Sequence, residues 1–190
     1  MNGPAFVKVA AKSAVEICAQ FQLDKSARGL LTKEAEPRDF LQALIDNHHY
    51  LAAIDFLAHA LPAREAVWWG CLCWQHACGD SLSRTERTAC QAAVVWVMRP
   101  GEETRAAAKT PGQLAGYASP AGALAIAANQ TGGSLAPANY PCIPPSPHAP
   151  AKAVAQSIKS ASLKGDPLRV ADRQRSYAVL GTAIAEGKYV

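Results

Sequence analysis

Cys71, Cys73, His76 and Cys78 form the group in this sequence that most resembles a set of metal ligands. Zinc prefers thiolate and imidazole ligands in tetrahedral geometry. The surrounding residues predict a continuous helix, in which each residue turns by about 100°. Cys71 and Cys78 then share a face from which Cys73 and His76 point away, so one metal ion cannot collect all four. The spacing favours cysteines that pack as small apolar side chains, and a small metal-binding or redox protein is the alternative.

Asp55 and His59 are the next candidates, because a carboxylate four residues before a histidine on a helix can orient a base. No motif ties a serine or cysteine nucleophile to them, so the pair predicts an ion pair on a helix surface. The sequence contains no HExxH, GxSxG or P-loop pattern. The Gly132-Gly133 pair predicts a turn. These residues therefore predict a protein that is not an enzyme and that uses no cofactor and no metal.

The composition predicts helices to carry these side chains. Alanine, the best helix former, supplies 39 of the 190 residues. The net charge of +4 is mild and no basic run is interleaved with aromatic residues, so we expect no nucleic-acid partner. No apolar run reaches the roughly 18 residues of a membrane span, and no secretory signal is recognisable. The six cysteines are therefore expected to be reduced thiols in a cytoplasm.

The pattern of apolar residues, caps and prolines predicts an all-α fold of antiparallel helical hairpins, in a compact bundle or a short solenoid-like array. We expect one domain over residues 1–190, with a helical core at about 37–130, a Pro-rich extended strap at 131–150 and C-terminal helices at 151–187. The expected helices span Pro4 or Ala11 to Phe21, Pro37 to about Asp46, Tyr50–Leu61, Pro62–Cys78 with Gly79 as a C-cap, Ser83–Arg99, Glu102–Lys109, Ser119–Asn129, Ala151–Leu163 and Leu168–Ala185. Residues 23–36 are expected to be a connection, and residues 47–49 a break.

The segment Thr110–Ala151 contains no Asp, Glu, Lys or Arg. Its second half carries prolines at 137, 141, 144, 145, 147 and 150, which predict a stiff chain close to polyproline II. The strap either lies across the helices of its own chain or serves as a docking surface. Trp68 and Trp69 are adjacent on a predicted helix and point about 100° apart, so one of them can be exposed as an interface anchor. The candidate partner-binding residues are Trp68, Trp69, Leu135, Pro137, Tyr140, Ile143, Pro144, Pro145 and Pro147.

Several short segments of the chain resemble a family of small bacterial proteins of unknown function. They are Pro37-Arg-Asp-Phe-Leu, Ala53-Ile-Asp-Phe-Leu-Ala-His-Ala-Leu-Pro62, Ala66-Val-Trp-Trp-Gly, Ala93-Val-Val-Trp96, Gly132-Gly-Ser-Leu-Ala-Pro137 and Pro144-Pro-Ser-Pro-His148. The likeness covers roughly Leu30 to Leu163, and its motifs are structural rather than catalytic. The resemblance implies a place near type VI secretion genes, beside effector, spike and thiolase-like genes. It supplies no catalytic residues.

Together these observations predict a noncatalytic adaptor or effector chaperone of a bacterial type VI secretion system. The expected partner is a protein: a secreted effector, a spike protein or a thiolase-like protein. Two alternatives stay open, the metal-binding or redox protein built on Cys71, Cys73, His76 and Cys78, and a structural scaffold that associates with itself.

Overall fold

The computed structural model describes residues 5–78, 83–136 and 139–188. The described residues form helices joined by turns and extended segments, with no strand, which confirms the all-α prediction. The chain divides into two compact units, Met1–Pro62 with Asp166–Val190 and Ala63–Gly165. Each unit is described by itself. The predicted single domain over residues 1–190 stays a prediction.

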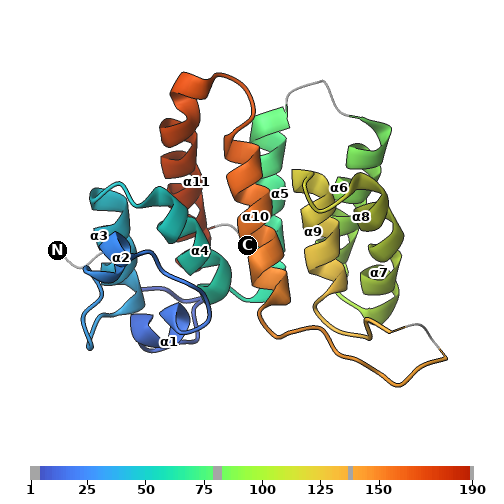
Figure 1. The fold of residues 1–190 in the computed structure, drawn as a ribbon, viewed down its shortest axis with the longest axis horizontal. Coiled ribbons are helices and arrows are strands. Elements are labelled where there is room, and N and C mark those ends of the chain that lie inside the picture. Colours follow the sequence, from blue (N-terminus) through green and yellow to red (C-terminus); the bar gives the residue numbers. More distant parts are fainter. Residues whose placement is uncertain (1–4, 79–82, 137–138, 189–190) are drawn as a thin grey trace. The chain divides into compact units, whose positions relative to one another are not determined.

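The first unit is built around α4 and α11, which pack against each other (Figure 1). In its core, the rings of Phe40 and Phe56 meet edge to face with centroids 5.3 Å apart. The chain reverses between α3 and α4 at His48, whose φ of 60° is left-handed, so the predicted break at 47–49 is confirmed. The helices are α1 (Ala14–Cys18), α2 (Lys25–Arg28), α3 (Pro37–Asp46), α4 (Tyr50–Ala60), the 3-10 turn η1 (Pro167–Arg169) and α11 (Val170–Ala185).

Two expectations for the N-terminal region were wrong. The first helix spans only Ala14–Cys18, because Ser13 is its N-cap and accepts a hydrogen bond from the amide of Val15. The expected connection at 23–36 contains the short helix α2, which Asp24 caps through a hydrogen bond from the amide of Ala27. Both helices begin at a side chain that accepts from a first-turn amide, a local signal that apolar periodicity does not register.

The second unit is organised around α9, which packs against α10, α6, α8 and α5 (Figure 1). Its small side chains allow close approach: a Cβ added at Gly122 would lie 2.1 Å from the carbonyl oxygen of Gly116. The hydroxyl of Ser157 on α10 donates to the carbonyl of Pro120 at 2.8 Å. The helices are α5 (Ala63–Cys78), α6 (Arg84–Met98), α7 (Glu102–Ala107), α8 (Lys109–Ala115), α9 (Pro120–Asn129) and α10 (Ala149–Ser162).

Helix starts in this unit follow the predicted capping chemistry. Ser83 and Glu86 form the predicted capping box at the start of α6. Ser119 accepts from the amide of Gly122, with Pro120 at the first position of α9. The expected helix Glu102–Lys109 is present as α7 and ends at Ala107, and α8, which was not predicted, follows it from Lys109. Because α8 begins at Lys109, Pro111 falls in its first turn, where a missing N–H costs nothing. The predicted C-cap Gly79 lies outside the described residues.

Candidate partner-binding surface: the proline strap

The strap, residues 131–150, follows the end of α9 and is described at 131–136 and 139–150. It was expected to be extended throughout, but its last two residues begin α10, with Pro150 in the first turn, where a missing N–H costs nothing. Its two halves meet at a hydrogen-bonded neck. The amide of Leu135 donates to the carbonyl of Ile143 at 2.8 Å. The hydroxyl oxygen of Ser134 accepts from the amides of Ala136 and Ile143, at 3.0 and 3.1 Å. The neck therefore closes a loop whose outer part carries Tyr140.

Arg105 on α7 fastens the start of the strap to the helices. Its Nη1 donates to the carbonyl of Asn129 at 2.7 Å and to that of Gly132 at 3.0 Å. The side-chain amide of Asn129 in turn donates a hydrogen bond to the main-chain carbonyl of Arg105 at 3.1 Å. On its other edge the guanidinium pairs with the carboxylate of Glu102, which raises the pKa of Arg105 and lowers that of Glu102. A permanently charged fork thus holds two carbonyls at the end of α9.

Gly133 allows this fastening. Its φ of +74° lies in the left-handed region that favours glycine. A Cβ at this position would lie 2.2 Å from Nη2 of Arg105. A residue with a side chain here would both strain the backbone of the turn and displace the guanidinium of Arg105. The predicted glycine turn is confirmed, with a packing role that the sequence pattern does not show.

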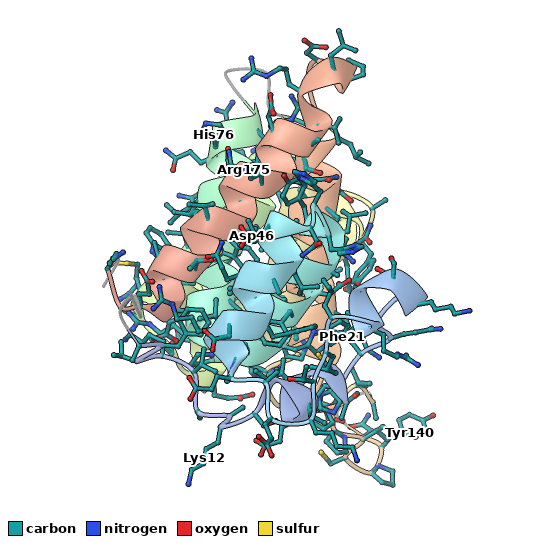
Figure 2. The ribbon with its side chains drawn as sticks, turned by 90° about the vertical axis from the view of Figure 1, so that its left-hand side faces the viewer. Lys12, Phe21, Asp46, His76, Tyr140 and Arg175 are labelled. Atoms are coloured by element: carbon teal, nitrogen blue, oxygen red, sulfur yellow. The ribbon has the colours of Figure 1, made fainter. Side chains whose placement is uncertain are left out.

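The outer part of the strap exposes three large apolar side chains. Leu135, Tyr140 and Ile143 are 55%, 68% and 56% exposed. Figure 2 labels Tyr140, whose side chain extends outward from the strap. Pro144 and Pro147 are also exposed, whereas Pro145 is half-buried and Pro150 is buried. Pro137 lies outside the described residues. These predicted residues form one uncharged surface with apolar side chains held in solvent.

A pocket of about 350 Å³ lies between the strap and the beginning of α5. It is lined by strap prolines, by the glycine turn and by the beginning of α5, through Pro144, Pro145, Pro150, Gly132 and Ala63. None of these side chains is ionisable, so the pocket offers shape and apolar contact rather than acid–base chemistry.

The two adjacent tryptophans of α5 are in different environments. Trp69 is fully buried, whereas Trp68 is half-buried, as the 100° turn between neighbouring helical positions allows. Trp69 therefore contributes to the core and is left out of the proposed surface. Trp68 lies on α5, not on the strap.

The cysteine cluster on α5 has the character of a packed interior. Cys71 and Cys73 are buried and reduced, and His76 is exposed (Figure 2). Burial raises the pKa of Cys73, and a hydrogen bond with Cys90 followed by burial raises that of Cys71. The same hydrogen bond lowers the pKa of Cys90 on α6. Among the residues described, no three His, Cys, Asp or Glu side chains are placed to share a metal ion. The side chain of Cys78 lies outside the described residues.

His59 contacts the aromatic ring of Phe21 and the backbone of its own helix. Its Nδ1 lies 2.8 Å from the carbonyl oxygen of Asp55, and its ring stacks on Phe21 with centroids 4.9 Å apart. This environment is half-buried and partly apolar. The carbonyl of Asp55 and the ring of Phe21 orient the imidazole. Neither contact is part of the ion pair that was predicted between the side chains of Asp55 and His59.

Sequence reasoning missed Arg105 as the residue that fastens the strap. Its spacing from Glu102 predicts an ion pair between neighbouring turns, but the carbonyls it holds lie 24 and 27 residues along the chain. The glycine pair and the change from helix to prolines indicated where the strap begins. Neither signal indicated that Arg105 fastens the strap to the helices.

The structure and its surface define a class: a helical protein that presents an uncharged proline strap. Residues 40–185 match the model of a family of unknown function (DUF6931), and the chain belongs to that family. No curated protein and no solved structure matches the chain. Across the part of the chain that is described, every helix is too short or too polar to cross a membrane.

Proposed function

We propose that this protein is a noncatalytic binding protein that holds a protein partner through the outer surface of its strap. The observation that carries the proposal is the exposure of Leu135, Tyr140 and Ile143 on a loop that is closed and fastened by hydrogen bonds. Exposed apolar side chains gathered on one segment are typical of interaction sites. A segment already held in one conformation loses less entropy when it binds.

The absence of charge supports the same proposal. The strap lies within a segment that has no Asp, Glu, Lys or Arg from Thr110 to Ala151. A loop whose only task is to connect two helices gains from charged side chains, which keep it in water. An uncharged loop with exposed tyrosine and isoleucine gains more from being covered.

The specific role we propose is that of an adaptor or effector chaperone for a type VI secretion system in the bacterial cytoplasm. The support is the family resemblance described from the sequence, which implies a place beside effector, spike and thiolase-like genes. The mild net charge and the uncharged strap suit a protein partner better than nucleic acid.

The experiment is affinity purification of the tagged protein from the bacterium that encodes it, with the bound proteins identified by mass spectrometry. We expect recovery of an effector, a spike protein or a thiolase-like protein in an amount comparable to the bait. Recovery of none of the three would contradict the secretion role. Light scattering across concentration distinguishes the alternative of a self-associating scaffold, and elemental analysis after chelator-free purification distinguishes the metal-binding alternative built on the α5 cysteines.

A further inference from the structure

The strap repeats proline with the period of a polyproline helix. Pro141, Pro144 and Pro147 stand three residues apart, and polyproline II has three residues per turn. In that conformation their rings lie along one edge of the strap, on which Pro144 and Pro147 also line the open pocket beside α5. Tyr140 and Ile143 directly precede Pro141 and Pro144, and both are more than half exposed.

Stereochemistry holds the backbone of this segment near that conformation. A proline ring fixes its own φ at about −65° and biases the residue before it toward extended or polyproline torsions. Between residues 140 and 147, every residue except Cys142 is a proline or directly precedes one. Residues 141–146 accordingly form no helix, strand or turn. The segment needs little further ordering to bind as a polyproline ligand.

The exposed groups of the segment define what can recognise it. Pro141 and Pro144 are exposed, and among the described residues their carbonyl oxygens accept no hydrogen bond. Proline rings are recognised by flat aromatic surfaces, and free carbonyls by the N–H or O–H of tryptophan and tyrosine. No acidic or basic side chain stands between residues 139 and 147, so a charged groove would gain no ion pair to offset its own desolvation.

We infer that the strap is bound by a partner whose groove is lined by aromatic side chains, carries no charge, and takes the prolines at 141, 144 and 147. The inference rests on the proposed function, because it assumes that the strap meets a protein. It adds the chemistry of the partner's site and the edge of the strap that enters it.

The test places a photo-crosslinking amino acid, benzoylphenylalanine, at position 143 of the full-length protein in its native host. The same group at position 114 is the control, because Leu114 is exposed on α8, which leads to the opposite end of α9. Mass spectrometry then identifies the partner peptide attached to each position. The protein with the crosslinker at position 143 is also combined with Pro144→Ala or with Pro145→Ala. The two changes are adjacent, but only Pro144 belongs to the series of prolines spaced three residues apart. Thermal unfolding checks that both variants fold.

We expect a crosslink from position 143, and none from position 114, to an uncharged peptide that contains tryptophan, tyrosine or phenylalanine. Pro144→Ala should reduce the yield of the crosslink from position 143 at least tenfold, and Pro145→Ala should reduce it less than threefold. A charged or non-aromatic peptide, or equal effects of the two proline changes, would overturn the inference while leaving a strap-bound partner in place. A partner that co-purifies but attaches only at position 114 would also overturn it. If no partner co-purifies, the proposed function fails and the inference fails with it.

Discussion

Helix α9 and the outer strap are neighbours in one uncharged segment, yet one is buried and the other is exposed. Helix α9 is almost entirely buried among α5, α6, α8 and α10. It satisfies its backbone internally and its alanines and glycines let other helices approach. The strap has the same lack of charge, but its prolines have no N–H and cannot continue a helix. Tyr140 and Ile143 consequently stand in solvent.

The comparison shows that an absence of charge has two meanings. In a segment that can form a helix, it indicates burial in the core of the same chain. In a segment that cannot, it indicates a surface that gains from being covered by something else. Three comparisons between variants test that distinction, from the largest expected loss of stability to the smallest.

The largest expected contrast is between Leu124→Ala in α9 and Ile143→Ala in the strap. Leu124 is fully buried, so its truncation leaves a cavity and should lower the free energy of unfolding by about 2–5 kcal/mol. Ile143 is exposed, so its truncation should change that free energy by less than about 0.5 kcal/mol. Denaturant unfolding measures both. A strap variant that destabilises the protein as much as Leu124→Ala would mean that the strap belongs to the core.

Arg105→Ala should release the start of the strap. The change leaves the carbonyls of Asn129 and Gly132 without their charged donor, which should cost about 1–3 kcal/mol of unfolding free energy. Amide hydrogen exchange at residues 134–136 should accelerate. The matched control is Glu102→Gln, which weakens only the exposed ion pair and should have a small effect on either measurement. Equal effects of the two changes would show that the pair, not the carbonyl contacts, fastens the strap.

The third comparison concerns the helical side, at the cap of α6, where the expected loss of stability is smaller than for Leu124→Ala. Hydrogen bonding from Ser83, and then the charge of Lys164, hold the pKa of Glu86 below its ordinary 4.5. A lowered folded-state pKa means that the stabilisation is present above the unfolded pKa and is lost as pH falls through the folded one. Glu86→Gln should therefore cost about 1 kcal/mol near pH 7, with the difference from wild type disappearing in acid. Denaturant unfolding at a series of pH values measures it, and a difference that grows in acid would contradict the assignment.

Local signals in the sequence predicted most of the helix boundaries. Pro37, the Ser83–Glu86 box and the Ser119-Pro120 pair act within a few residues, and each marks a helix start in the structure. The late start of α1 and the presence of α8 were missed, because apolar periodicity registers neither an N-cap inside an apolar pattern nor a proline that is tolerated in a first turn. Local signals are strong where a side chain bonds its own helix.

The site could be located from the sequence but not assembled from it. The prolines identified the strap, because their effect on the backbone is local, and the missing charges set the same segment apart by composition. The hold of Arg105 on Asn129 and Gly132 depends on how α7 and α9 pack, which no local pattern encodes. Adjacent tryptophans likewise indicate that their environments differ without indicating that Trp69 is the buried one.

The most direct test of the central claim compares two matched double variants in affinity purification from the native host. Tyr140→Ser with Ile143→Ser changes the strap. The control, Leu114→Ser with Tyr117→Ser, likewise changes one aliphatic residue and one tyrosine at exposed positions, beside the start of α9. We predict that the strap variant recovers at least tenfold less of the proposed protein partner while the control retains it, with both proteins folded. Retention by the strap variant and loss by the control would contradict the account.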